Sequence, residues 1–338
     1  MSTLETQALD EVIASGRRRM LTIGAVALAG MALPSMATAQ SSTLTDSDYL
    51  NFALNLEYLE ANFYTLAASG QTIDQMGISL SGTGTQGTVT VKAGGPAACK
   101  VPFTNSLVQS YAMEIAKEER NHVSFLQSAL GSAAVAQPAI DLVNSFNGLA
   151  ALLGLGLASF DPFANDINFL LGSYIFEDVG VTAYTGAAPL LTSSTNLDAA
   201  AGIQGVEAYH AGLIRTVIYG LDQSNTTLGP AGTASAVASA ISKLRATVDG
   251  SDSISSTRED GDDIGLGTQT VMLNGTSGFS ASTLVNATTT GSINAAGSGG
   301  TAGSMVFART AAEVLAIVYA GGSGKGGFFP AGLNGNVK

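Results

Sequence analysis

The sequence predicts an all-α fold: an antiparallel four-helix bundle with a crossover connection, followed by a C-terminal extension rich in Gly, Ser and Thr. The main observation concerns the only two histidines of the chain, since Glu119 precedes His122 by three residues just as Glu207 precedes His210. Residues three apart lie on one face of a helix, so each pair can point two metal-binding groups in one direction. Two further segments carry a Glu in a second shared pattern.

That second pattern is a Glu followed by a Tyr seven residues later, which occurs as Glu57 with Tyr64 and as Glu177 with Tyr184. Seven residues are two helical turns, so each Glu and its Tyr share a face. Helical bundles that hold two metal ions use one Glu from each of two helices and a Glu-x-x-His pair from each of two others. The predicted metal ligands are therefore Glu57, Glu119, His122, Glu177, Glu207 and His210.

Two positions leave this ligand assignment open. Glu60 competes with Glu57 on the first helix, and Glu118 could pair with His122 at a spacing of four residues. We prefer Glu57 because the Tyr at its seventh following position recurs after Glu177. Several carboxylates facing one core would each cost several kcal/mol unless protons or cations neutralised them, which favours metal binding.

In this order of motifs the chain resembles the ferritin-like superfamily of four-helix di-iron carboxylate proteins, over about residues 45–220. A weaker, general similarity points to secreted bacterial ferritin-like proteins and plant desiccation-related proteins. The resemblance implies two metal ions, with iron favoured over manganese. The Glu of each Glu-x-x-His pair would bridge or chelate the metals, each His would cap one metal, and the other two Glu would be terminal ligands. It also implies O2 or peroxide as the small-molecule substrate.

The predicted bundle helices each start at a capping residue and stop at a Gly or Pro. The first two run from near Thr45 or Asp46 to Gly70 and from Thr104 or Asn105 to Gly131, the third opens at Asp161-Pro162 and ends before Pro189, and the fourth follows Asn196. Residues 132–160 are long enough to cross the bundle. The two helical hairpins with matching ligands read as a degenerate internal repeat.

Residues 1–39 are interpreted as a twin-arginine signal peptide. Arg17-Arg18-Arg19 precedes an apolar stretch at residues 21–33, and Ala37-Thr38-Ala39 is a small-residue cleavage site. A membrane anchor fits less well, because about thirteen apolar residues are short of the roughly twenty that span a bilayer. The mature chain is therefore expected to be periplasmic or extracellular and to have no membrane span.

Composition restricts the partners. The chain has 14 basic and 26 acidic residues and a formal charge of −12, so nucleic acid is an unsuitable partner. Cys99 is the only cysteine, which excludes an intrachain disulfide and predicts a packed, unreactive thiol in the loop of residues 70–103. An alternating run at residues 87–91 predicts a short hairpin or edge strand there.

Residues 221–338 form the predicted C-terminal extension, with helices near residues 231–248 and 308–320 and a strand-like patch at residues 270–273. It would act as a surface arm, or as a packing element that covers the bundle or a partner subunit of a homo-oligomer.

Two functions follow from these patterns. The first is an exported di-metal protein with a protective oxidase or peroxide-removing role, which would make it a di-iron or di-manganese oxidoreductase. The alternative is a non-catalytic, stress-related envelope or surface protein built on the same bundle. Iron storage fits less well, because cage-forming members are much shorter chains. Whether the chain is an enzyme, and which residues would be catalytic, stays open at this point.

Overall fold

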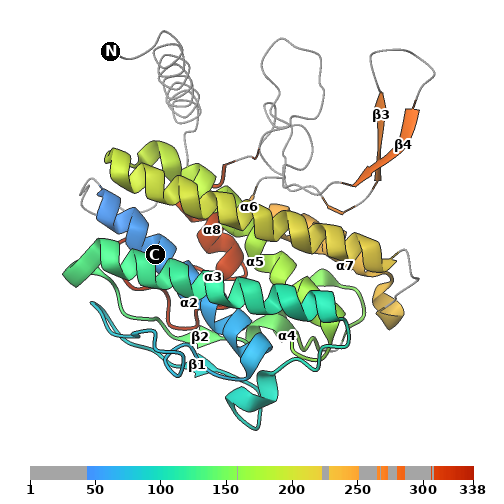
Figure 1. The fold of residues 1–338 in the computed structure, drawn as a ribbon, viewed down its shortest axis with the longest axis horizontal. Helices are drawn as coiled ribbons and strands as arrows, with labels where there is room; N and C mark the ends of the chain where they lie inside the picture. Colours follow the sequence, from blue (N-terminus) through green and yellow to red (C-terminus); the bar gives the residue numbers. More distant parts are fainter. Residues whose placement is uncertain are drawn as a thin grey trace.

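The fold is a four-helix bundle with short helices and strands around it (Figure 1). The computed structural model describes residues 44–157, 159–222, 228–250, 265–266, 268–272, 280–285, 306 and 308–338. The predicted signal peptide, residues 1–39, lies outside them. The bundle helices are α2 (Asp46–Ser69), α3 (Ser106–Leu130), α5 (Asp166–Ala187) and α6 (Ser194–Asp222). Because α2 packs most extensively on α3, and α5 on α6, the predicted pair of hairpins is confirmed.

The first hairpin begins and ends at the predicted residues. Thr45 and Asp48 form a capping box at the start of α2, and Gly70 ends this helix with a left-handed φ of 72°. Asn105 caps α3 by accepting hydrogen bonds from two backbone amides of the first turn, and Gly131 follows the last turn.

The predicted start of the third helix at Asp161-Pro162 is wrong, because α5 begins at Asp166 after the N-cap Asn165. Asp161 instead lies in the turn before α5. Its carboxylate accepts a hydrogen bond from the amide of Phe163 and forms an ion pair with Lys92. Asp166 carries the structural role, since its carboxylate accepts hydrogen bonds from residues 104 and 105 and so ties the start of α5 to the start of α3.

The fourth helix also starts earlier than predicted, at Ser194 rather than after Asn196. The carboxylate of Asp46, at the start of α2, accepts from the backbone amides of Thr192 and Ser193 and from the Asn196 side chain. Burial acts to raise the pKa of Asp46, but these hydrogen bonds hold it well below its usual range. The two hairpins are therefore joined at this end through one carboxylate.

The connection between the hairpins contains a short helix and a strand. Helix α4 spans Asn144–Leu153, and β2 (Ile140–Asp141) pairs in parallel with β1 (Val89–Thr90) from the long first loop. The alternating run therefore forms a two-residue edge strand and no hairpin. Cys99 is fully buried in this loop, and burial raises the pKa of its thiol, as expected for an unreactive packed cysteine.

The two described helices of the extension, α7 (Ala234–Asp249) and α8 (Ala311–Val318), pack on the bundle. The extension also contains the antiparallel strands β3 (Thr268–Met272) and β4 (Ser280–Val285). Helix α8 contacts α5 and α7. The segment before α8 crosses α5 closely, because a Cβ at Gly186 would lie 1.8 Å from the carbonyl oxygen of Arg309. Residues 308–338 therefore serve as a packing element over the bundle.

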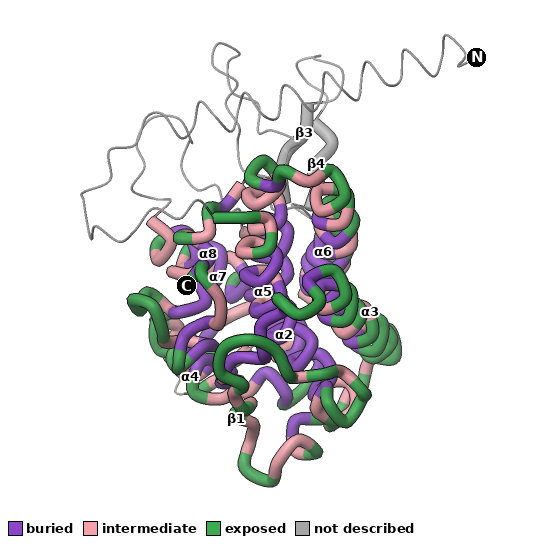
Figure 2. Tube along the Cα trace, turned by 90° about the vertical axis from the view of Figure 1, so that its left-hand side faces the viewer, coloured by how far each residue is buried: buried purple, intermediate pink, exposed green. Residues whose placement is uncertain are grey.

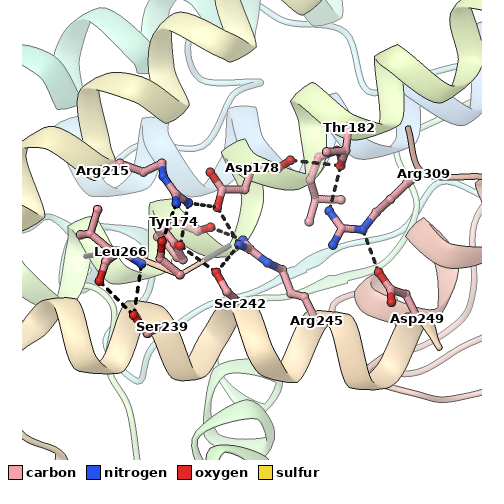
Figure 3. Close-up of polar contacts among 12 residues, drawn as sticks. Tyr174, Asp178, Thr182, Arg215, Ser239, Ser242, Arg245, Asp249, Leu266 and Arg309 are labelled. Carbon is pink, nitrogen blue, oxygen red and sulfur yellow. Dashed lines mark hydrogen bonds and ion pairs between the residues drawn. The ribbon is translucent and has the colours of Figure 1, made fainter. Parts of the chain in front are cut away.

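A buried polar network attaches α7 to α5 and α6 (Figure 3). The Asp178 Oδ2 atom accepts from Arg215 at 2.7 Å and from Arg245 at 2.6 Å, so one carboxylate of α5 joins a guanidinium group of α6 to one of α7. Both guanidinium groups also stack on the ring of Tyr174, at 5.1 and 4.8 Å from its centroid. These side chains are all buried, which fixes the place of α7 against the second hairpin.

The interior of the bundle is formed mainly by α2 and α5, whereas α3 and α6 carry exposed outer faces (Figure 2). An aromatic cluster fills the region between α2, α5 and the crossover, where Phe63 packs against the rings of Phe146, Phe163, Phe169 and Phe176. Among the described residues, no helix combines the length and the hydrophobicity needed to cross a membrane.

Candidate metal centre

The predicted ligands meet in the middle of the bundle. None of the six is more than 8 % exposed, and five are at 0 or 1 %. They form two groups whose ligand atoms lie within 4.8 Å of one another: the first is Glu57, Glu119, His122 and Glu207, and the second is Glu119, Glu177 and His210. Glu119 belongs to both groups, which is the position of a carboxylate that bridges two metal ions.

The first group converges on one imidazole nitrogen. The Nδ1 atom of His122 lies 3.2 Å from Glu57 Oε2, 3.3 Å from Glu119 Oε2 and 3.6 Å from Glu207 Oε1. A single ring nitrogen carries at most one proton and cannot donate to three carboxylates. The arrangement therefore suits a cation shared by the four side chains.

The second group converges on the other histidine. The Nδ1 atom of His210 lies 3.1 Å from Glu119 Oε1 and 3.2 Å from Glu177 Oε2. Glu119 thus directs one oxygen toward each histidine, and the two rings are 6.5 Å apart between centroids. Glu207 joins the group of His122 and not that of His210, so the second Glu-x-x-His pair is divided between the two groups.

The buried polar atoms of the centre fit bound cations. Within the described residues, six of them have no hydrogen bond of normal geometry: Glu119 Oε1, both carboxylate oxygens of Glu177 and of Glu207, and His210 Nδ1. An unsatisfied buried polar group costs about 1–3 kcal/mol, so six in one place indicate missing partners. Carboxylate oxygens with two imidazoles are a donor set that suits iron or manganese. The residues present therefore fit a two-metal site.

The pKa values of the metal-free cluster also favour a site that binds cations. Burial raises the pKa of Glu57 to about 7 and raises that of Glu207 well above its usual range. Burial alone would lower the pKa of His122, but the carboxylates of Glu57 and Glu119 raise it to about 12. Burial acts to raise the pKa of Glu119 too, yet the two histidines hold it below its usual range. In the absence of metal, the cluster therefore retains protons at neutral pH.

The orientation of His210 depends on its second ring nitrogen, whose partner is Glu118. The Nε2 atom of His210 lies 2.7 Å from Glu118 Oε2, so the carboxylate accepts a hydrogen bond from Nε2–H while Nδ1 is directed at the cluster. The alternative that pairs Glu118 with His122 is not what the structure shows. The Glu118 side chain is 34 % exposed, so it reaches the buried imidazole from the surface between α3 and α6.

The repeated tyrosines contact the opposite helix. Tyr184 of α5 donates a hydrogen bond to Glu57 of α2. Tyr64 of α2 acts on Glu177 of α5 and lowers its pKa, which burial raises overall, although the Tyr64 hydroxyl has no hydrogen bond of normal geometry within the described residues. Each Tyr thus interacts with the ligand Glu of the opposite helix, and not with the Glu two turns before it on its own helix.

One residue that supports the centre has no chemistry of its own and was missed from the sequence. A Cβ atom at Gly180 would lie 2.1 Å from Glu207 Oε2, so any other residue would force this carboxylate to move from its position. The sequence does indicate this position, because Gly180 follows Glu177 by three residues and therefore lies on the ligand-bearing face of α5.

Glu60 occupies the corresponding position on α2, three residues after Glu57, and is 6 % exposed. It belongs to neither ligand group. Burial raises its pKa well above the usual range, with further contributions from Glu119 and Glu177. Glu60 is thus a buried acid beside the centre, and the geometry favours Glu57 as the ligand of this helix. Ligation itself stays a prediction for all six residues.

Comparisons with known proteins agree with this geometry. The chain is 34% identical over 182 residues to the desiccation-related protein PCC13-62 of Craterostigma plantagineum, covering 52% of this chain and 53% of that one. It therefore spans about half the length of that relative. It is also 26% identical over 300 residues to the ferritin-like catalase Nec2 of Nesocodon mauritianus, covering 86% of this chain and 84% of that one.

No solved structure matches the chain. The family model described as ferritin-like domain matches residues 45–220, which contain all four bundle helices and all six predicted ligands. The chain belongs to the ferritin-like domain family.

Proposed function

We propose that this chain is an exported di-metal oxidoreductase, with iron rather than manganese, that protects its host by reacting with O2 or removing peroxide. The observation that carries the proposal is Glu119, shared between two buried groups that each contain one histidine. The name of one relative, a ferritin-like catalase aligned over 86% of this chain, supports the peroxide reaction.

The chemistry divides between the metals and the protein. Bound iron or manganese would supply redox change and Lewis acidity. The six ligands would hold the two ions, with Glu119 between them. Tyr184 donates a hydrogen bond to a Glu57 oxygen, and Glu118 fixes the orientation of His210. The surrounding apolar bundle excludes bulk water, which strengthens the electrostatic interactions inside.

Metal analysis tests the centre. Protein matured through its own export route should contain about two metal ions per chain, as two-metal carboxylate bundles do. Glu119→Ala should remove both ions because this residue serves both groups, and His210→Ala should weaken one. Glu114→Ala is the matched control, since Glu114 lies on the same helix, accepts a hydrogen bond from the exposed Tyr209 and belongs to neither ligand group. Well under two metals in the natural protein would reject the proposal.

Turnover distinguishes the two candidate functions. The oxidoreductase should release O2 from peroxide or consume O2 when reduced, and metal-depleted protein should do neither. The non-catalytic alternative is favoured by one observation, the 34% identity to a desiccation-related protein. Full metal content without either reaction would support that alternative.

Export has its own test. Replacing Arg17, Arg18 and Arg19 together by Lys keeps the charge but removes the twin-arginine pattern, so the variant should accumulate in the cytoplasm with its precursor length. Fractionation and immunoblotting of the two forms measure this. Unchanged export of the Lys variant would argue against the twin-arginine route.

A further inference from the structure

An apolar groove runs from the surface to the metal centre between α2 and α5, and α8 lines it from the C-terminal extension. Its half-buried outer part includes Ala53 of α2 and Ala183 of α5. Its buried inner part includes Glu57, the ligand of the first group, with Glu60 and Tyr184. The groove therefore connects a half-buried opening to a predicted metal ligand.

The size of the groove limits what can enter. The space accessible to a water-sized molecule is about 40 Å³. A water molecule needs about 10–15 Å³ on this measure, so the groove holds about three small molecules in a row. Free space reaches about 610 Å³ only when open solvent at the mouth is included. Sites for organic ligands measure about 300–1,000 Å³, so an organic substrate does not fit.

The lining limits the chemistry. The groove walls are mainly apolar side chains, including Val179, Ile317 and Phe328, which offer few partners to a charged or polar molecule. Moving a hydroxyl group into apolar surroundings without a hydrogen bond costs about 2–7 kcal/mol, which disfavours peroxide along these walls. Dioxygen is small, neutral and apolar, and it makes no strong hydrogen bonds.

We propose that the groove between α2, α5 and α8 conducts dioxygen between the surface and the metal centre. The inference rests on the proposed function, since dioxygen would enter as the substrate of an oxidase or leave as the product of peroxide removal. It adds a route for dioxygen and names residues that determine its width. Ala53 of α2 and Ala183 of α5, both small, line the half-buried end of the groove.

The first test needs no turnover. Crystals of the metal-free protein under xenon pressure should show xenon in the groove, because small apolar cavities bind this gas. Ala53→Leu and Ala183→Leu should each remove the xenon. Ala68→Leu is the control, since Ala68 is a half-buried alanine of the same helix that does not line the groove. Absence of xenon from the wild-type groove would overturn the proposal.

The second test measures the rate of reaction. In metal-loaded, reduced protein, each Leu variant should slow the bimolecular reaction with O2 at least about tenfold, because a filled groove leaves no void as large as a water molecule. Metal content and the rate of the first turnover with peroxide, before product dioxygen has to leave, should stay within about twofold of wild type, since neither depends on this void. An O2 rate equal to that of Ala68→Leu would overturn the route.

The two proposals fail in different ways. Wild-type protein without metal rejects the proposed function, whatever the xenon result. Wild-type protein with metal but without xenon, or with an O2 rate that filling the groove does not change, rejects the dioxygen route and leaves the metal centre standing. Circular dichroism shows whether each Leu variant folds. If one does not, the xenon result on the wild-type protein and on the other Leu variant decides whether the dioxygen route stands.

Discussion

At the scale of single residues, the space beside a ligand matters as much as the ligand. Gly180 lies inside α5, where glycine costs about 0.5–1 kcal/mol relative to alanine. The cost is offset because the Glu207 carboxylate occupies the place of the missing side chain. A helix-interior glycine is therefore part of the metal centre.

Gly180→Ala should accordingly displace Glu207 and lower metal affinity by at least about tenfold, comparable to losing a supporting contact of a metal ligand. Helix content should stay normal. Competition with a chelator measures the affinity. The matched control is Gly205→Ala in α6, where nothing lies within 4 Å of the added Cβ, and it should raise stability by about 0.5–1 kcal/mol without affecting metal. Equal metal affinity in both variants would contradict the account.

Glu118 is expected to act as a positioning residue for His210. Glu118→Ala removes the acceptor of the Nε2 proton and should weaken metal binding about 10–100-fold. Glu118→Gln retains an acceptor oxygen and should recover part of the affinity, whereas a general effect of surface charge would be the same in both variants. Glu114→Gln serves as the control on the same helix. Full affinity in the Ala variant would remove Glu118 from the centre.

At the scale of elements, α2 and α5 form an imperfect repeat. Glu57 and Tyr64 correspond to Glu177 and Tyr184, but Glu60 corresponds to Gly180. The carboxylate of Glu207 fills the space at Gly180, whereas α2 places an acid of its own at the equivalent position. The difference agrees with the unequal ligand groups, of which one has four members and the other three.

The C-terminal segment is held on the bundle by Asn334. Its side chain donates to the carbonyl groups of Thr85 and Ala136 and accepts from the amide of Thr85, while its backbone bonds the side chain of Asn55 in α2. This residue therefore joins the chain end to the first loop, the crossover and a bundle helix.

Asn334→Ala should reduce the free energy of unfolding by about 1–3 kcal/mol, because it leaves polar groups of two segments, at Thr85 and Ala136, without this partner. Urea titration followed by circular dichroism measures this change. Asn336→Ala is the control: its side chain donates a hydrogen bond to Asp48 at the exposed start of α2, so the loss should stay within about 0.5 kcal/mol. Equal losses in the two variants would show that the segment is not anchored at Asn334.

At the scale of the whole molecule, stability should depend on pH in opposite ways with and without metal. In the metal-free fold the pKa of Glu57 is raised from 4.5 to about 7 and that of His122 from 6.5 to about 12. Both groups bind their protons more tightly in the folded state than in the unfolded state. The stability that these protons give to the fold is fully present below the pKa values of the unfolded state. It is lost as pH rises through the pKa values of the folded state.

Metal-free protein should therefore lose stability from pH 5 to pH 8, by about 1.4 kcal/mol per pH unit for each proton that only the folded state retains. Metal ions displace these protons, so metal affinity should rise over the same range. Calorimetry of loaded and chelator-treated protein at pH 5, 6.5 and 8 should show the two melting temperatures diverging. A metal-free melting temperature that rises toward pH 8 would contradict the protonation scheme.

The sequence by itself determined the four bundle helices, the pairing into two hairpins and the six side chains that meet in the core. Spacings of three and seven residues place side chains on one helical face whatever the helix packs against, so Glu119 and His122 had to point the same way. Local caps such as Thr45, Asn105 and Gly70 act within one turn and were therefore also readable.

Only the tertiary structure decided which group faces which across the bundle. The grouping of Glu207 with His122, the contact of Glu118 with His210 and the crossed tyrosines depend on the rotation and depth of each helix, which no local spacing determines. The start of α5 was misjudged for the same reason. Asp161 has the local form of a cap, but a lysine sixty-nine residues away in the chain binds its carboxylate in the fold.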